Sequence, residues 1–195
     1  MKLESDSAKD YETYANEFLS VRDSSIINTD EVVQWCQNLG DGTEVVELGA
    51  GGGCPVTKAL IAEGLYVWAM DASPTLVDKF YSRFPQIPVQ CTRIQNFDFF
   101  NRSYDGAIAI GLMFLLSPSD QAELISSVSS ALVRGGGFLF TAPEQECEWI
   151  DVITGTESES LGIKRYEELL ATSGFRLRST FSDSGGNNYF DAVLV

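Results

Sequence analysis

Residues Glu44 to Ser73 read EVVELGAGGGCPVTKALIAEGLYVWAMDAS. A short apolar run opens the stretch, as is typical of a buried strand, and small residues follow it at once. Pro55 then opens a predicted helix, because proline is tolerated in a first helical turn, and Gly64 ends it. Tyr66 to Met70 predict a second buried strand that ends at Asp71. The stretch is therefore predicted to form one βαβ unit.

The glycines of this unit and the acid at its end predict a nucleoside ligand. Gly49, Gly51 and Gly53 let the backbone approach a ligand closely and adopt φ values that other residues avoid. Asp71 follows them by about 20 residues at the tip of the next strand, where an acid can accept hydrogen bonds from ribose hydroxyls. A glycine-rich turn can also be no more than a tight connection, and the position of Asp71 favours the ligand.

The spacing of the glycines argues against a dinucleotide. A pyrophosphate-binding loop has the pattern G-x-G-x-x-G, with the pyrophosphate on the helix N-terminus. Counted from Gly49, the third position of this pattern is Cys54, and counted from Gly51 it is Val56. An NAD(P)-dependent oxidoreductase built on the same βαβ unit stays an alternative, weakened by this failed third glycine.

The run from Glu47 to Gly53 has the form acid-x-G-x-G-x-G and resembles the first motif of the class I S-adenosylmethionine-dependent methyltransferases. The resemblance implies S-adenosyl-L-methionine as the cofactor, with the glycine loop against its methionine part, Asp71 on its ribose and Glu47 toward its ammonium group. The implied cofactor contacts in this region are Glu47, Gly49, Ala50, Gly51, Gly53, Asp71, Ala72 and Ser73.

The resemblance continues along the chain to Val195. Residues 104–110 resemble the fourth strand of the family, which implies that Gly111 and Met113 line the cofactor and substrate site. In the loop 92–103 the family often places an acid against the adenine amino group, and this chain has none at the matching positions. There Ile94 can flank the adenine ring and Gln95 can reach its polar edge.

The predicted fold class is α/β: a Rossmann-like, doubly wound sheet of seven strands, mostly parallel with an antiparallel C-terminal strand, and helices on both faces. Helices are expected over 1–24, 26–39, 55–63, 75–84, 121–133 and 163–173, and strands over 45–48, 66–70, 87–91, 104–110, 138–141, 175–181 and 189–195. A chain of 195 residues predicts a single domain, 1–195, with an N-terminal helical lid (1–40) and a cofactor-binding core (43–195).

Three segments supply candidates for the acceptor side of the site. Residues 142–162 lack clear periodicity and leave the carboxyl end of the fifth strand, where open α/β sheets bind ligands. The N-terminal segment carries aromatic residues at helical spacing; it is either packed on the core or, as in related methyltransferases, folded over the cofactor. The C-terminal hairpin of the family has its turn at the pocket rim. The expected substrate contacts are Tyr11, Phe18, Gln145, Trp149 and Asn188. Equally, the acids of 142–162 can be a solvated face and Trp149 a packing anchor.

The sequence contains no histidine, so the common base at neutral pH is missing. Methyl transfer from a sulfonium gains most from positioning donor and acceptor, and it needs a base only for a protonated acceptor. Glu144, Asp151 and Tyr189 are the catalytic candidates, unless the acceptor arrives as a thiolate, a carboxylate or a free amine. The predicted activity is methyl transfer to an O, N or S atom of a small molecule, and the alternative is an S-adenosylmethionine-binding protein without catalysis.

Composition limits the partners. The net charge of −15 argues against nucleic acid and against anionic membrane surfaces, which attract Lys and Arg clusters. No apolar run approaches the ~18 residues of a membrane span, and no signal-peptide core is visible at the start. Cys36, Cys54, Cys91 and Cys147 have no metal-site spacing, so no metal is expected. We therefore expect a cytoplasmic monomer or homodimer with a small-molecule substrate.

Overall fold

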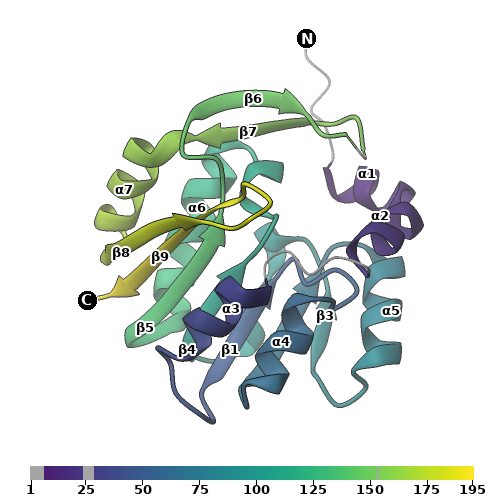
Figure 1. The fold of residues 1–195 in the computed structure, drawn as a ribbon, viewed down its shortest axis with the longest axis horizontal. Helices are drawn as coiled ribbons and strands as arrows, with labels where there is room; N and C mark the ends of the chain where they lie inside the picture. Colours follow the sequence, from purple (N-terminus) through teal and green to yellow (C-terminus); the bar gives the residue numbers. More distant parts are fainter. Residues whose placement is uncertain (1–6, 24–28, 153) are drawn as a thin grey trace.

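The computed structural model describes residues 7–23, 29–152 and 154–195. Its centre is a seven-stranded sheet with the order β3-β2-β1-β4-β5-β9-β8 (Figure 1). The strands are β1 (Glu44–Leu48), β2 (Tyr66–Asp71), β3 (Val89–Cys91), β4 (Tyr104–Ala109), β5 (Leu132–Thr141), β8 (Phe175–Ser182) and β9 (Asn188–Leu194). β1 to β5 pair in parallel, whereas β9 is antiparallel to both β5 and β8. The predicted fold class is confirmed.

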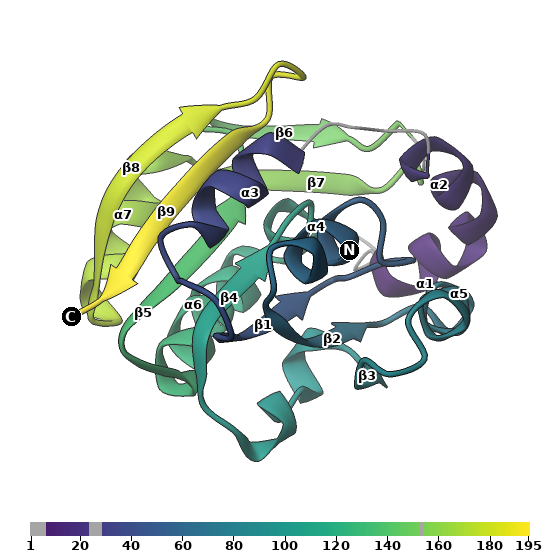
Figure 2. The same cartoon turned by 60° about the horizontal axis from the view of Figure 1, so that its bottom comes forward.

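Helices cover both faces of this sheet (Figures 1 and 2). They are α3 (Thr29–Cys36), α4 (Val56–Ala62), α5 (Pro74–Arg83), α6 (Pro118–Ala131) and α7 (Gly162–Thr172). Because side chains alternate along a strand, β5 sends Phe138 and Phe140 to the core under α6 and α7, and Leu139 to the core under α3 and α4. Each face therefore has its own apolar layer, as expected for a buried parallel sheet.

The strand order reverses at β1, which has β2 on one side and β4 on the other. The connection after β1 enters α4 on one face of the sheet, and the chain later returns to β4 on the opposite side of β1. Ligands of open α/β sheets bind at such a switch point, beyond the carboxyl ends of the strands. The predicted glycine loop, residues 49–53, lies at this point.

The N-terminal segment forms two short helices and not the one expected. α1 (Ser7–Thr13) and α2 (Ala15–Arg22) are separated at Tyr14, whose φ of −106° and ψ of 17° are not helical. The expected helix positions 1–6 and 24–28 lie outside the described residues. α3 belongs to the core, where Val32 and Trp35 are buried, so only α1 and α2 lie over the carboxyl end of the sheet.

Residues 142–162 correct the prediction of an irregular segment. They form a second, two-stranded antiparallel sheet from β6 (Glu146–Ile150) and β7 (Glu157–Leu161), which crosses above the main sheet toward α1 and α2 (Figures 1 and 2). Its periodicity is hidden because the buried side of β7 is made by Ser158 and Ser160, which are polar. We refer to β6, β7 and their turn as the cap hairpin.

β5 begins earlier than the predicted strand over 138–141, at Leu132, so residues 132–137 also belong to the strand. Three 3₁₀ turns complete the description: η1 (Ile94–Asn96), η2 (Phe99–Asn101) and η3 (Met113–Leu115). Within the described ranges, no helix has the length and apolar character needed to cross a membrane.

Candidate active site

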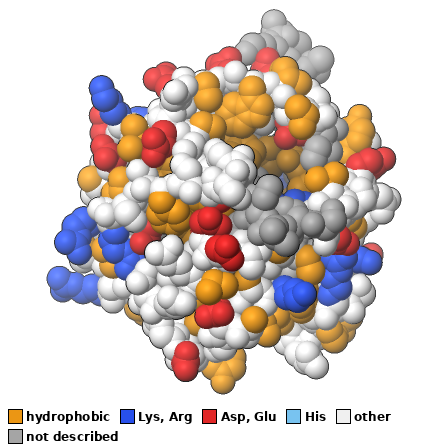
Figure 3. All heavy atoms as spheres, viewed as in Figure 1, with side chains coloured by type: hydrophobic (Ala, Val, Ile, Leu, Met, Phe, Trp, Pro, Cys, Tyr) orange, Lys and Arg blue, Asp and Glu red, His pale blue; other side chains and the backbone are white. Residues whose placement is uncertain are grey.

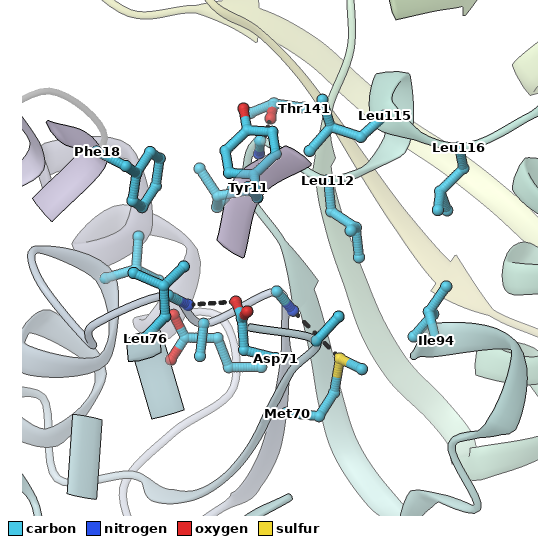
Figure 4. Close-up of a pocket in the computed structure, with 18 of the residues that line it drawn as sticks. Tyr11, Phe18, Met70, Asp71, Leu76, Ile94, Leu112, Leu115, Leu116 and Thr141 are labelled. Atoms are coloured by element: carbon cyan, nitrogen blue, oxygen red, sulfur yellow. Dashed lines mark hydrogen bonds between the residues drawn. The ribbon is translucent and has the colours of Figure 1, made fainter. Parts of the chain in front are cut away.

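A cavity of about 280 Å³ lies at the switch point, beyond the ends of β1, β2, β4 and β5. Its floor is formed by the glycine loop and by residues that follow β2 and β4 (Figure 4). Tyr11 and Phe18 cover it from α1 and α2, and Asp151 reaches it from the cap hairpin. Hydrophobic side chains gather over the cap hairpin in the space-filling view (Figure 3).

The backbone of the glycine loop passes close beneath the Phe18 side chain of α2. Gly49 and Gly51 have φ values of +73° and +56°, in the left-handed region that favours glycine. A Cβ at Gly51 would lie 3.2 Å from the Phe18 ring, so the bare backbone lets α2 come down onto the loop. The N–H groups of Gly49 and Ala50 both donate to the Met70 carbonyl, at 3.0 and 2.9 Å, which fixes the loop to the end of β2.

Asp71 connects the glycine loop with α5. Its Oδ2 accepts from the Gly51 N–H at 2.7 Å (Figure 4). Its Oδ1 accepts from the Ser73 N–H at 2.9 Å. Burial raises the pKa of Asp71, and these backbone N–H groups oppose the rise. Each carboxylate oxygen retains a further lone pair, so Asp71 can still accept hydrogen bonds from a diol.

Glu47 is a second buried carboxyl at the cavity, with 3% of its surface exposed. The Thr57 hydroxyl donates to Glu47 Oε2 at 2.5 Å. Burial raises the pKa of Glu47 to about 8, and this hydrogen bond and the Arg22 guanidinium oppose the rise. Arg22 lines the same cavity from the end of α2, and burial lowers its pKa. A carboxyl and a guanidinium thus face one end of the cavity.

Polar contacts hold α1 and α2 over the cavity. Glu12 accepts from the Ser73 hydroxyl and from both the N–H (3.1 Å) and the hydroxyl (2.7 Å) of Thr75, at the start of α5. Asp23 pairs with Arg83, which also donates to the Gly52 carbonyl at 2.9 Å. We refer to α1 and α2 together as the lid. These contacts join the lid to α5 and, through Arg83, to the glycine loop.

The lid also meets the cap hairpin. The Tyr11 hydroxyl donates to the Asp151 carboxylate, and burial, followed by this carboxylate, raises the pKa of Tyr11. Asp151 Oδ1 accepts from the Thr154 N–H at 2.8 Å and from its hydroxyl at 2.9 Å, which fixes the carboxylate in the hairpin turn. The contact between Tyr11 and Asp151 therefore joins the lid to the cap hairpin across the cavity.

Most of the predicted cofactor residues line this cavity. The structure brings together Tyr11, Phe18, Glu47, Gly49, Ala50, Gly51, Asp71, Ala72, Ile94, Gln95, Gly111 and Asp151. These come from the lid, from the ends of β1, β2 and β4, from the loop after β3 and from the cap hairpin. Residues far apart in the sequence thus converge because parallel strands all end at this edge.

Three predicted cofactor residues lie behind the lining. Gly53 packs against α5, where a Cβ would lie 2.4 Å from the Phe84 ring. Ser73 is the N-cap of α5, and its Oγ accepts from the Leu76 N–H at 3.2 Å. Met113 is completely buried in the main core because the η3 turn points its side chain inward.

The predicted acceptor-side residues are mostly outside the lining too. Tyr189 is fully buried and donates to Asp183 at 3.0 Å, because in the register of β9 it faces the core. Trp149 packs on Phe114, with ring centroids 5.3 Å apart, and so supports a lining residue from behind. Glu144, Gln145 and Asn188 do not line the cavity, and the Asn188 side chain instead donates to Ser182 Oγ at 2.8 Å.

Sequence reasoning missed several lining residues, which are Arg22, Cys54, Val56, Met70, Leu76, Arg93, Ile110, Leu112, Phe114, Leu115, Leu116 and Thr141. Arg22 carried a usable signal, because it follows Phe18 by one helical turn and so shares its face. Thr141 carried none: its hydroxyl accepts from the Gly111 N–H at 2.8 Å, a contact between the end of β5 and the segment after β4 that spacing does not reveal.

Comparison with known proteins indicates a methyltransferase fold. Residues 45–136 match a family model described as a methyltransferase domain. A search of the curated proteins gives no match. Among solved structures, the magnesium protoporphyrin IX methyltransferase of Synechocystis PCC 6803 with bound S-adenosylhomocysteine is similar, with a TM-score of 0.79 and 17% identity over 97% of this chain and 100% of that one.

Two further structures are similar in fold. One is the glycopeptide N-methyltransferase MtfA, with a TM-score of 0.70 and 20% identity over 87% of this chain and 97% of that one. The other is the S-adenosylmethionine-bound amino pentose methyltransferase CalS10 of Micromonospora echinaspora, with a TM-score of 0.72 and 12% identity over 92% and 96%.

These findings agree with the observed sheet and with the position of the cavity. The fold is that of the class I methyltransferases, as the resemblance inferred from the sequence implies. Residues 45–136 match a methyltransferase domain, and the whole chain is similar in fold to methyltransferases solved with S-adenosylmethionine or S-adenosylhomocysteine.

Proposed function

We propose that the protein is an S-adenosylmethionine-dependent methyltransferase, that it acts on a small molecule and that the acceptor atom is an amine nitrogen. The observation that carries the proposal is the enclosure of the cavity by α1, α2 and the cap hairpin, with Asp151 at the contact between them. A volume of about 280 Å³ is just below the range of roughly 300–1,000 Å³ for ligand sites, so the acceptor is small.

The cavity suits S-adenosylmethionine in three places. Asp71 is the acceptor for the ribose hydroxyls, because its carboxylate is fixed at the end of β2. Arg22 pairs with the methionine carboxylate and the Glu47 carboxyl accepts from the ammonium group, since the two side chains face the same end of the cavity. When bound, the cofactor supplies an electrophilic methyl group on a positively charged sulfur.

The acceptor lies on the side of the cavity formed by Tyr11, Phe114 and Asp151. Phe114 offers an apolar surface that Trp149 supports from behind. Asp151 accepts an N–H of the neutral amine, which turns the nitrogen lone pair away from the carboxylate and toward the glycine loop. With the cofactor bound, its methyl group would pass from sulfur to this nitrogen, and Asp151 would take up the surplus proton of the product and pass it to water. Positioning of this kind supplies most of the rate enhancement for a displacement.

One neighbour in fold supports nitrogen as the acceptor atom, because it is a glycopeptide N-methyltransferase. The absence of histidine also favours an amine, since a free amine needs no base before it attacks, whereas an alcohol does. Glu144 and Tyr189, which lie outside the lining, have no role in this proposal.

The test is a panel of small amines, alcohols, carboxylic acids and thiols, incubated with S-adenosylmethionine and read out as released homocysteine and as a methyl group added to the product. We expect turnover with amines, and a loss of at least ~10-fold in kcat/KM for Asp151→Asn from the weakened charge-assisted hydrogen bond. Glu148→Gln, an exposed acid of β6, is the matched control. Turnover confined to alcohols or thiols would contradict the amine proposal.

The same proposal places the protein in the cytoplasm, as a monomer or homodimer that binds no nucleic acid. The net charge of −15 supports the last point. On the face shown in Figure 3, Lys and Arg side chains gather toward the two sides of the molecule. Sedimentation of the purified protein with and without duplex DNA tests both the assembly and the binding.

A further inference from the structure

Thr141 places a buried hydroxyl group at the cavity. Thr141 is the last residue of β5, and it lines the cavity although only 4% of its surface is exposed. In Figure 4 it lies on the same side of the cavity as Tyr11, away from Met70 and Asp71. Its Oγ accepts from the Gly111 N–H at 2.8 Å, which fixes the hydroxyl beside the segment that follows β4.

The Thr141 hydroxyl can make one more hydrogen bond. A threonine hydroxyl donates one hydrogen bond while its oxygen accepts another. Among residues 7–23, 29–152 and 154–195, no group accepts from this O–H, and the contact with Gly111 is the one hydrogen bond of the side chain. Buried polar groups are nearly always paired, so an open donor at the wall of a cavity indicates a place for an acceptor atom of a ligand.

The strand order separates this hydroxyl from the proposed cofactor contacts. Glu47 belongs to β1 and Asp71 ends β2, whereas Thr141 ends β5, which is two strands from β1 and three from β2. Neighbouring strands are about 4.8 Å apart, so Thr141 lies about 10 Å across the sheet from β1 and about 14 Å from β2. A ligand atom at Thr141 therefore belongs to the methyl acceptor, on the side of Asp151.

The charges of the lining favour a neutral oxygen at Thr141 over a carboxylate. Within the described residues, the cations that line the cavity are Arg22 and Arg93. Arg22 is assigned to the cofactor, and Arg93 follows β3, at the opposite edge of the parallel strands. A carboxylate at Thr141 would share the acceptor side with Asp151, and two like charges repel.

A second polar side chain favours a hydroxyl over a carbonyl oxygen. Thr141 pairs with Tyr189 of β9, and Asn187, two residues before Tyr189, also lines the cavity. Asn187 Nδ2 donates to Asp183 Oδ2 at 2.8 Å, which directs the amide oxygen of Asn187 away from this carboxylate. A hydroxyl of the ligand can accept from Thr141 and donate to an amide oxygen, whereas a carbonyl can only accept.

We propose that Thr141 is a substrate-binding residue that makes the site select a 1,2-amino alcohol. Its O–H donates to the hydroxyl oxygen of the substrate while Asp151 accepts from the adjacent amine. The two groups are adjacent because the cavity of about 280 Å³ also holds the cofactor. The inference rests on the proposed methylation of an amine and names its substrate class. Two contacts fix the orientation of the reacting nitrogen better than one, which favours the displacement.

The experiment compares trans-2-aminocyclohexanol with cyclohexylamine as methyl acceptors of the full chain, with S-adenosylmethionine present and the methylated amine as the readout. The measured quantity is the ratio of kcat/KM for the amino alcohol to kcat/KM for the amine. In Thr141→Val this ratio should be at least ~10-fold lower than in the unmodified protein, because valine keeps the shape and cannot donate. Thr141→Ser keeps the hydroxyl and should retain the ratio. The basicities of the two amines cancel because every protein is given the same pair.

A third amine tests the inference without any substitution. In trans-2-fluorocyclohexylamine the fluorine lowers the basicity of the amine, as a hydroxyl does, but accepts hydrogen bonds poorly. The unmodified protein should methylate it at least ~10-fold less efficiently than the amino alcohol. Equal kcat/KM values for these two amines would contradict the inference even where Thr141→Val does not fold.

Two controls separate substrate binding from other roles of Thr141. Thr172→Val removes an exposed threonine hydroxyl from α7 and should leave the ratio unchanged. The Kd for S-adenosylhomocysteine, measured by calorimetry, should be the same in Thr141→Val and Thr141→Ser. An unchanged ratio in Thr141→Val, or a loss of S-adenosylhomocysteine affinity as large as the fall in the ratio, would overturn the inference.

The inference and the proposed function fail in different ways. If the unmodified protein methylates other amines of the panel but not the amino alcohol, the amino-alcohol inference is overturned and amine methylation stands. Turnover confined to alcohols or thiols would overturn both.

Discussion

The carboxylate of Asp71 accepts a hydrogen bond from the N–H of Gly51 at 2.7 Å, so the ribose acid and the glycine loop form one hydrogen-bonded unit. Their sequence separation of 20 residues is closed by the parallel pairing of β1 with β2. Because the same carboxylate also accepts from the Ser73 N–H, a change at position 71 affects loop, helix and ligand together.

Asp71→Asn should therefore weaken cofactor binding and also reduce the stability of the free protein. The amide nitrogen cannot accept from a backbone N–H, so one of the two contacts is lost. We expect a loss of ~1–3 kcal/mol in binding of S-adenosylhomocysteine, or roughly 5- to 150-fold in Kd. Calorimetry measures the first effect and the melting temperature without ligand the second. Unchanged affinity would remove Asp71 from the site.

Glu47→Gln should stabilise the free protein at alkaline pH. The pKa of Glu47 is raised to about 8, so the folded state holds this proton more tightly than the unfolded state. The resulting stability is complete below the ordinary pKa of 4.5 and is lost as the pH rises through about 8. The glutamine cannot ionise, so the variant should melt at increasingly higher temperature than the unmodified protein as the pH rises from about 5 to about 8. Glu167→Gln, at an exposed position of α7, is the control. A constant difference across this range would contradict the buried-carboxyl interpretation.

Arg22→Lys should weaken only those ligands that carry the amino-acid part of the cofactor. A lysine keeps the charge but loses the two-pronged geometry that a guanidinium offers to a carboxylate. We expect Kd for S-adenosylhomocysteine to rise by roughly 10-fold and Kd for methylthioadenosine, which has no carboxylate, to stay the same. Equal losses for both ligands would assign Arg22 to the lid structure and not to the ligand.

Glu12→Ala should loosen the lid. Glu12 takes three hydrogen bonds at the start of α5, and it is half-exposed, so the contact is worth about 1 kcal/mol. We expect S-adenosylhomocysteine to dissociate roughly fivefold faster, measured by stopped-flow displacement, because the lid must open for release. Glu17→Ala removes an exposed acid from α2 and serves as the control. Equal rates in both variants would show that Glu12 does not hold the lid closed.

The main sheet and the cofactor end of the site could be predicted from the sequence because local signals there agree. The glycine loop and Asp71 are visible as residue types at fixed spacing, and the strands and helices are visible as apolar residues that repeat every 2 or 3.6 positions. The structure places these elements where the sequence predicts them. The cap hairpin could not be predicted, since Ser158 and Ser160 are its buried side chains and carry no hydrophobic pattern.

The acceptor side of the site was less predictable because it depends on strand register. Which face of a strand or turn a residue occupies depends on register, and a shift of one residue reverses it. Tyr189 and Asn188 therefore lie outside the lining, and their neighbour Asn187 lines it. Asp120 illustrates a further limit: its contact with Gln95 spans 25 residues and joins two elements that no periodicity connects.

The central claim is that the cavity at the end of β1 and β2 binds an adenosyl amino acid. Calorimetric titration of the unmodified protein with S-adenosylhomocysteine and, separately, with NADH tests it most directly. We predict saturable one-to-one binding of S-adenosylhomocysteine and no heat of binding with NADH. Binding of NADH without S-adenosylhomocysteine would contradict the claim and restore the dinucleotide alternative.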